Sequence, residues 1–280
     1  MNRLIINFLK KNKKSNINFN KNLFKQLKLK KLNISFSQNF EDLILKRLFP
    51  SDNSFYVDVG ANSPIINSNT MLFYLEGSRG INIDAQEKVV KDLKTFRAKD
   101  KNILALIDSS KKTVEFNYHK ISSRSSSNEK FIDLSKRGLN NSDHQTNLVN
   151  KITTTLTEIL KKNKCPKQFN FLNVDVEGSE FNALKGLDLN IYKPKIIIVE
   201  TSPPYDLDRK YKKNFRNDKF KIKSYLNKHD YTILYEDLVN TWFCKKRNSK
   251  SFKKKISFPI SKLYDNFITF QHFQSLVNKK

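Results

Sequence analysis

The sequence predicts an α/β protein built on a mostly parallel sheet with helices on both faces. Short apolar runs recur along the chain and alternate with segments of helical periodicity, which is the pattern of parallel strands that are buried on both faces. Several of these runs end in an acid, and a glycine follows the first of them. Ligands of such sheets bind outside the carboxyl ends of the strands, so these acids predict a site at one edge of the sheet.

The first half of the domain is predicted to alternate helix and strand. The leading helix is favoured by apolar residues at three-to-four spacing and by capping at Ser37 or Asn39. The later helices each follow an apolar run and place their own apolar residues on one side. In order, the predicted elements are a helix over 35–49, the strand FYVDV (55–59), a helix over 68–77, the strand GINID (80–84), a helix over 86–98, the strand NILALID (102–108) and an alternating strand TVEFNYH (113–119).

The second half resumes this alternation after a long interruption. Residues 120–150 are rich in Ser, Asn and Lys, and we interpret them as a variable loop. The last two runs are separated by a single acid, which is typical of an antiparallel pair. The predicted elements are a helix over 155–163, the strand FNFLNVD (169–175), a helix over 177–187, the strand KIIIVE (195–200), a helix over 218–228 and the strands YTILYE (231–236) and LVNTWFC (238–244).

The net charge of +26 is concentrated in two arms. Residues 1–40 carry ten Lys or Arg and no acid, and residues 245–280 carry ten against one acid. We therefore divide the chain into a basic extension (1–34), a domain (35–244) and a second basic extension (245–280). The aromatic residues of the second arm are expected to pack part of it on the domain.

The positive charge of the two arms favours binding to an anionic polymer or to an anionic membrane surface. Only 9 of the 53 basic residues are Arg, which disfavours nucleic acid because base readout relies on Arg. The same excess of Lys, together with abundant Asn, also fits a drift in composition with no partner at all.

The chain is predicted to work in the cytoplasm, with the inner face of the membrane as a second place for the arms. No apolar run approaches the ~20 residues of a membrane-spanning helix, and the first residues do not read as a secretory signal. The two cysteines, Cys165 and Cys244, are isolated, which favours a reducing compartment. The four histidines form no ligand pair, and no metal is predicted.

The loop after the first predicted strand favours a particular ligand. A dinucleotide-binding turn would read GxGxxG, but Asn62 and Ile65 stand where its second and third glycines would fall. This disfavours a dehydrogenase. Asp58 suits a cationic group, and Asp84, at the end of the second strand, suits the two hydroxyls of a ribose. A ligand with a ribose, a cationic end and no phosphate is S-adenosylmethionine, and the competing interpretation is a plain strand-to-helix turn.

The sequence resembles the FkbM-type S-adenosylmethionine-dependent methyltransferases over about residues 37–245. The family often has Trp where Ser78 stands here. The resemblance implies a Rossmann-like methyltransferase fold with a seven-stranded sheet, and O-methylation of a sugar, glycan or related metabolite. It is carried by SQNFEDL (37–43), FYVDVGAN (55–62), SNT (68–70), SRGINIDA (78–85), TLTEIL (155–160), FLNVDVEGSE (171–180), LKG (184–186), KPKIIIVE (193–200) and NTWF (240–243).

The residues that match these motifs give the expected site. At the acceptor end, Asp175 or Glu177 is the expected general base. Asp175 could instead hold the methionine amino group, and Glu177 could merely favour the positive end of a helix. Glu200 is a weaker candidate. The expected cofactor-binding residues are Asp58, Gly60, Ala61, Asn62, Asn69, Asp84 and Asp108.

Two other classes of function stay open at this point. One is a non-enzymatic basic module that binds an anionic polymer or a membrane surface, and the other is an oxidoreductase with a nucleotide cofactor. The strand-end acids favour the methyltransferase over the first class, and the missing glycines favour it over the second. The acceptor, a small molecule or a glycan, and the oligomeric state are not predicted more closely.

Overall fold

The fold is taken from a computed structural model of the chain, which describes residues 33–51, 53–119, 125–127, 146–202, 209–257 and 267–272. The predicted N-terminal extension, up to residue 32, lies outside the described residues, and so does most of the predicted variable loop. Among the described residues, no helix has both the length and the hydropathy that crossing a bilayer requires.

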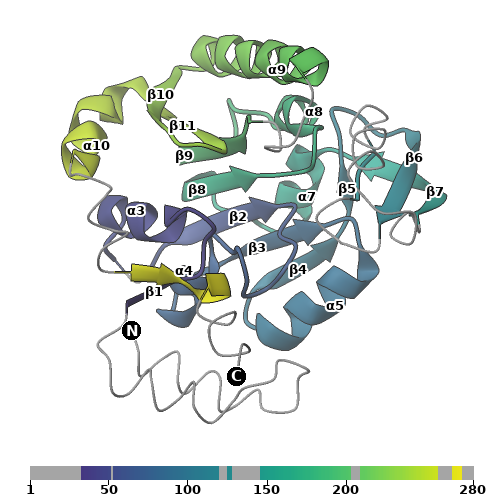
Figure 1. Cartoon of the computed structure of the whole chain (residues 1–280), viewed down its shortest axis with the longest axis horizontal. Coiled ribbons are helices and arrows are strands. Elements are labelled where there is room, and N and C mark those ends of the chain that lie inside the picture. The colour runs from purple at the N-terminus through teal and green to yellow at the C-terminus, as the bar shows by residue number, and fades with distance from the viewer. Residues whose placement is uncertain are drawn as a thin grey trace.

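A seven-stranded sheet forms the centre of the molecule (Figure 1). Strand β11 runs antiparallel to both its neighbours, and the other pairs in the sheet are parallel. The predicted sheet, mostly parallel with an antiparallel C-terminal pair, is therefore confirmed. From edge to edge its strands are β10 (Tyr231–Glu236), β11 (Asn240–Lys245), β9 (Lys193–Glu200), β8 (Gln168–Val174), β2 (Phe55–Val59), β3 (Arg79–Asp84) and β4 (Lys101–Leu104).

The strand order reverses between β2 and β8. The chain runs from β2 outward to β4 and then returns to β8 on the other side of β2 before it continues to β9. Asp58 pairs in register with Asn173, and Val59 pairs with Val174. The carboxyl ends of two strands with different onward connections thus lie side by side, which is where ligands bind in open α/β sheets.

Alternation along the strands fills two cores, one on each face of the sheet. Tyr56 and Phe171 belong to one buried cluster, and Val57 and Leu172 belong to the other. Helices therefore cover both faces, as the sequence predicts. The first face packs against α3 (Glu41–Leu48), α4 (Met71–Leu75), the end of α5 (Glu87–Phe96) and α10 (Ser249–Ile256), and the second against α7 (Leu156–Lys162), α8 (Glu180–Lys185) and α9 (Arg209–Lys228).

The predicted strand over 102–108 is wrong in part, because the run is broken into two strands. β4 ends at Leu104, and β5 (Leu106–Ile107) belongs to a separate three-stranded sheet. Between them the N–H of Ala105 donates to the carbonyl of Asp84. At the outer edge of the large sheet the chain has a partner on one side only, so it is free to leave and pair elsewhere.

The end of the predicted loop over 120–150 is also wrong, because it forms β7 (Thr146–Thr154). This strand pairs antiparallel with β6 (Thr113–His119) and parallel with β5. The small sheet lies to the right of the large one in Figure 1. β7 reads TNLVNKITT and shows no regular alternation of polar and apolar residues, so the sequence pattern did not indicate a strand. The strand forms through its pairing with β6.

Several helices are shorter than predicted, and the C-terminal arm contains ordered elements. α3 begins only at Glu41, although Ser37 still accepts the N–H of Asp42 through its hydroxyl. After β11 come a 3-10 turn (η3, Lys246–Asn248), α10 and β12 (Phe267–Thr269), which pairs in parallel with β1 (Asn33–Ser35). Phe252 and Phe270 are buried, so this part of the arm packs on the domain.

Candidate active site

Asp58 lies at the point where the strand order reverses, near the end of β2. It shares the face of Tyr56, where its carboxylate is buried. Its Oδ1 accepts a hydrogen bond of 2.9 Å from Asn173 Nδ2, and its Oδ2 accepts one of 2.9 Å from the hydroxyl of Thr70. Burial raises the pKa of Asp58, while these two hydrogen bonds oppose the rise.

Gly60 joins the two halves of the site. Its φ of +79° lies in the left-handed region, and a Cβ at this position would stand 1.6 Å from the carbonyl oxygen of Asp175. The N–H groups of Gly60 and Ala61 both donate to the carbonyl of Ile83, at 2.9 and 3.1 Å. The sequence suggested a glycine that lets a ligand approach, and the structure adds that the loops after β2 and β8 touch only because Gly60 has no side chain.

Asp84 closes the loop after β2 from the neighbouring strand. Its Oδ2 accepts the N–H of Asn62 at 3.0 Å, and its Oδ1 accepts the N–H of Gln86 at 2.9 Å. Burial raises the pKa of Asp84 to about 6. An ionised carboxylate has about four acceptor positions, so each oxygen keeps room for one ribose hydroxyl. The role predicted for Asp84, binding of the ribose hydroxyls, stays a prediction.

Asn69 belongs to the same group, but Asp108 does not. Asn69 Nδ2 donates to Asn173 Oδ1 at 3.0 Å, one step from Asp58. Asp108 follows β5, where its own N–H pairs with Thr154 of the small sheet. Its carboxylate binds the backbone and hydroxyl of Ser109 and forms an ion pair of 3.1 Å with Lys112. Because β4 ends before β5 begins, Asp108 does not stand at the end of a strand of the large sheet.

Three acids converge at the ends of β8 and β9. Oxygens of Asp175, Glu180 and Glu200 lie within 4.8 Å of one another, a spacing that could hold a metal ion. Glu180 Oε1 accepts the N–H groups of Val176 and Gly178, at 3.0 and 2.9 Å. In contrast, Asp175 Oδ1 is buried and accepts no hydrogen bond from any described residue. One oxygen of the cluster is therefore left for a partner that the described chain does not supply.

Burial raises the pKa of each acid in this cluster. Burial raises the pKa of Asp175 to about 6 and that of Glu180 to about 7. Burial and the charge of Asp175 raise the pKa of Glu200 well above its usual range. The carboxyl groups of Asp175 and Glu200 lie close together, and the repulsion between two neighbouring negative charges favours a proton on one of them.

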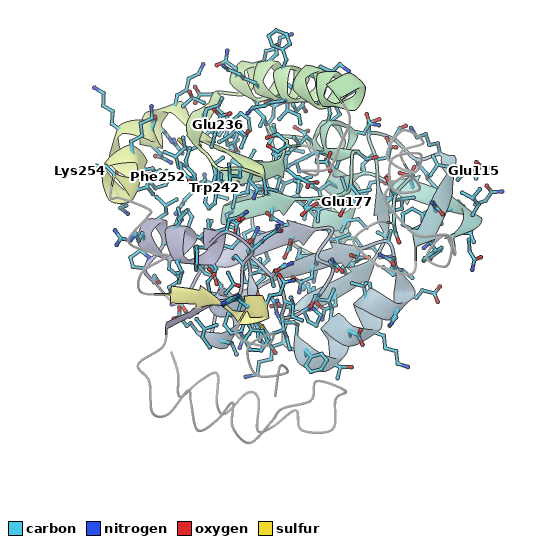
Figure 2. All side chains as sticks on the ribbon, viewed as in Figure 1. Glu115, Glu177, Glu236, Trp242, Phe252 and Lys254 are labelled. Carbon is cyan, nitrogen blue, oxygen red and sulfur yellow. The ribbon has the colours of Figure 1, made fainter. Side chains whose placement is uncertain are left out.

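Glu177 stands on the loop between β8 and α8, and Figure 2 labels it on the side of the small sheet. It adopts a φ of +56°, and its carbonyl accepts the hydroxyl of Ser126 at 2.8 Å. α8 begins only at Glu180, which is the acid of the first turn. The favourable interaction of an acid with the positive N-terminal end of a helix therefore applies to Glu180 and does not explain Glu177.

The small sheet reaches over the carboxyl ends of the large one. Lys151 Nζ on β7 donates to the carbonyl of Ala85. Ser125 donates to Gln86 Oε1 at 3.3 Å, while its neighbour Ser126 reaches Glu177. These contacts connect the region after β3 with the region after β8.

Sequence reasoning missed Asn173, Thr70 and Glu180. Asn173 offered a usable signal, because it is a polar residue inside an apolar run and lies two positions before Asp175, on the same side of the strand. Thr70 and Glu180 looked like ordinary residues at the starts of helices, and only the structure shows what they bind.

Comparisons with known proteins show which family the chain resembles. The profile of the methyltransferase FkbM domain matches residues 58–233. An O-methyltransferase from Bacillus cereus, solved in complex with SAH, is 9% identical, with 87% of this chain and 98% of that chain covered and a TM-score of 0.42. An SAH-bound methyltransferase of Podospora anserina is 9% identical, with coverage of 74% and 77% and a TM-score of 0.39. None of the curated proteins matches the sequence.

The family match spans more than half of the chain and contains both halves of the site. It begins at Asp58, the residue at the reversal of strand order, and includes Asp84, Asp175 and Glu200. The chain belongs to the FkbM family of S-adenosylmethionine-dependent methyltransferases.

Proposed function

We propose that the protein transfers a methyl group from S-adenosylmethionine to a hydroxyl group of a sugar, glycan or related metabolite. The observation that carries this proposal is the buried Oδ1 of Asp175, which accepts no hydrogen bond from the described residues and lies beside Glu200, whose pKa is raised. A hydroxyl is a weak acid and a poor nucleophile at neutral pH, so its methylation gains from a placed base that takes the proton.

The cofactor fits the residues of the first half of the site. S-adenosylmethionine supplies an electrophilic methyl group on a positively charged sulfur. Asp84 would accept hydrogen bonds from its ribose hydroxyls through the free positions on both carboxylate oxygens. Asp58 would attract its cationic amino group, because it is a buried anion near the sheet edge. The acids around Asp175 add negative charge where the sulfonium would lie.

The proton step uses the chain's own groups. S-adenosylmethionine, when bound, would supply the methyl group, and Asp175 Oδ1 would take the proton of the acceptor hydroxyl. Asp175 is suited to this because its pKa of about 6 keeps it ionised near neutrality while leaving it a fair base. Glu200, when protonated, would hold Asp175 in place by donating a hydrogen bond to it. A placed base contributes about 10²–10⁴-fold to such a rate.

The rim of the site supports a hydroxylated acceptor. Ser125 and Ser126 come from the segment after β6, Asn69 from the start of α4, and Glu177 from the loop after β8. These side chains donate and accept hydrogen bonds, as the ring of hydroxyls on a sugar requires. Hydrogen bonds of Ser125 to Gln86 and of Ser126 to Glu177 keep these polar groups between the regions that follow β3 and β8.

The test is acceptor-dependent formation of S-adenosylhomocysteine with methyl-labelled cofactor and a panel of nucleotide sugars, oligosaccharides and polyhydroxylated metabolites. We expect a labelled product that survives mild alkali, because a methyl ether is stable where a methyl ester is hydrolysed. Deoxy analogues of the active acceptor would locate the hydroxyl. Label that is lost in alkali, or found on nitrogen, would contradict O-methylation of a hydroxyl while leaving the methyltransferase class intact.

We further propose that the basic arms hold the enzyme near an anionic surface or an acidic acceptor in the cytoplasm. Support comes from the excess of Lys in residues 1–40 and 245–280. In Figure 2, Lys254 of α10 points away from the body on the side opposite Glu177. This part of the second arm could therefore contact a surface while the site stays open.

A further inference from the structure

Arg97, directly after α5, is a fully buried cation beneath the loop that follows β2. Burying a guanidinium is costly, and apolar side chains of similar volume often give equal or greater stability. Arg97 does not touch the rim of the site. Any effect of Arg97 on the site is therefore transmitted through the residues that it contacts.

Several hydrogen bonds of Arg97 balance the positive charge of its guanidinium. Arg97 Nε and Nη2 donate to Asp100 Oδ2, at 3.1 and 2.8 Å, and Nη2 also donates to the Tyr56 hydroxyl at 2.8 Å. Tyr56 in turn donates to Asp100 Oδ2 at 2.7 Å. Nη1 reaches the carbonyl of Pro64 at 3.4 Å. These contacts fix the guanidinium between α5, β2 and the loop.

The remaining contact is directional. Arg97 Nη2 lies 3.2 Å from the Thr70 hydroxyl oxygen. A guanidinium only donates, so Thr70 accepts in this bond and its single proton is directed elsewhere. Thr70 donates that proton to Asp58 Oδ2 at 2.9 Å. Arg97 therefore favours the orientation in which the Thr70 hydroxyl points at Asp58, and the hydroxyl of Ser68, 3.4 Å from Thr70 Oγ1, is also within reach of Thr70.

The other oxygen of Asp58 is held in the same way. Asn173 Nδ2 donates to Asp58 Oδ1 at 2.9 Å, and Asn69 Nδ2 donates to Asn173 Oδ1 at 3.0 Å. Each carboxylate oxygen thus accepts from a side chain whose orientation is set by a second donor. The two sets of hydrogen bonds differ in one respect. The set that runs through Thr70 ends at a cation, Arg97, and the set that runs through Asn173 does not.

Asp58 needs that cation because its other charged neighbours are acids. Asp84 faces it from β3, Asp175 from the loop after β8, and Asp100 from the segment after α5. Arg97 opposes these three charges, and it does so from a fully buried position.

We infer that Arg97 is a positioning residue, which acts through the Thr70 hydroxyl to keep Asp58 ionised and oriented toward the amino group of the bound cofactor. The inference deepens the proposed function and rests on it. It predicts that cofactor binding depends on a hydroxyl that need not touch the cofactor, and that this dependence grows as the pH falls.

The experiment compares Thr70→Val with Thr70→Ser by calorimetric titration at about pH 6 and about pH 8. The ligands are S-adenosylhomocysteine and 5′-methylthioadenosine, which has the same nucleoside but no amino-acid part. We expect Thr70→Val to bind S-adenosylhomocysteine about tenfold more weakly at the lower pH and closer to wild type at the higher pH. Methylthioadenosine should bind both variants like wild type, and Thr70→Ser should restore binding of S-adenosylhomocysteine.

Two controls separate positioning from general damage. Thr157→Val removes another hydroxyl with two hydrogen bonds, on α7 far from Asp58 in the sequence, and should leave the pH dependence of binding unchanged. Arg97→Met should reproduce the Thr70→Val pattern if it folds. Equal binding of both ligands by Thr70→Val and wild type at both pH values would overturn the inference, as would equal losses for both ligands. A wild-type chain that binds neither ligand would overturn the proposed function itself.

Discussion

The two halves of the site differ in the hydrogen bonds that their acids accept. On the cofactor side, both oxygens of Asp58 and both oxygens of Asp84 accept hydrogen bonds from fixed donors. On the acceptor side, Asp175 and Glu200 face each other, and one oxygen of Asp175 has no donor among the described residues. Fixed donors oppose the rise in pKa that burial causes, and a neighbouring acid adds to that rise.

This difference indicates that the two halves of the site have different functions. The cofactor side has a buried cation, Arg97, one hydroxyl away from Asp58. On the acceptor side, no Lys or Arg of the described chain forms an ion pair with Asp175, Glu180 or Glu200. A fixed negative field suits the binding of a cation, and a proton-sharing pair suits the removal of a proton. The predictions below would break or sharpen that division.

The largest expected effect is on turnover at the acceptor side. Asp175→Asn keeps the shape and removes the base, so the rate of methyl transfer should fall by about 10²–10⁴-fold. The affinity for S-adenosylhomocysteine should change much less. Glu177→Gln is the matched variant on the same loop and should lose less than about tenfold in rate. If Glu177→Gln is the slower of the two in a methyl-transfer assay, the two residues exchange roles.

The next effect is on binding at the cofactor side. Asp84→Ala removes the acceptor of two backbone N–H groups and of the ribose hydroxyls. Groups left unpaired in this way cost ~1–3 kcal/mol, so the Kd for S-adenosylhomocysteine should rise by about 5–150-fold. Thermal unfolding of the variant would report any loosening of the loop itself. An unchanged Kd in a folded variant would remove Asp84 from the site.

A smaller effect concerns stability and pH on the acceptor side. The folded-state pKa of Glu200 is raised, so between its usual value near 4.5 and the raised value the folded chain binds the proton more tightly than the unfolded chain. Its contribution to stability is therefore full at low pH and is lost as the pH rises. Glu200→Gln cannot titrate, so its Tm should exceed that of wild type at about pH 8 and approach it at about pH 5.

The control for this comparison is Glu87→Gln, an exposed acid in the first turn of α5. It should leave the pH dependence of the wild-type Tm in place. A Glu200→Gln curve that runs parallel to the wild-type curve across this range would show that Glu200 does not hold a proton in the folded chain.

The smallest effect is expected from the N-terminal arm, which contains none of the proposed site residues. Removing residues 1–30 should leave cofactor binding unchanged but weaken retention on anionic vesicles and acidic polysaccharide. The difference should shrink as salt is added, because exposed charges are screened within ~8 Å at physiological ionic strength. Equal co-sedimentation of trimmed and full-length protein at low salt would show that the arm's charge is compositional drift.

The sequence was sufficient for what depends on pattern. Apolar runs and helical periods predicted the strands of the large sheet, and five acids were expected at strand ends: Asp58, Asp84, Asp108, Asp175 and Glu200. Of these, Asp108 follows a strand of the small sheet instead. The sequence failed where the outcome depends on a distant partner, because β7 needs β6 opposite it and β5 needs β7 beside it.

The same limit applies within the site. Thr70 and Arg97 are joined by a contact across 27 positions of the chain, and no local pattern marks either as a partner of Asp58. The pairing of Asp175 with Glu200 likewise depends on β8 and β9 lying side by side. Residue types and strand ends predicted which acids to consider, but the number of donors around each acid required the structure.

The most direct test of the whole account is a calorimetric titration of the full-length chain with S-adenosylhomocysteine, with NAD and a short DNA duplex titrated in parallel. We predict saturable one-site binding of S-adenosylhomocysteine, weakened by Asp84→Ala, and no comparable binding of NAD. Binding of NAD without S-adenosylhomocysteine would indicate an oxidoreductase. Binding of DNA alone would indicate a basic binding module, and either result would contradict the assignment of this strand edge to a methyl donor.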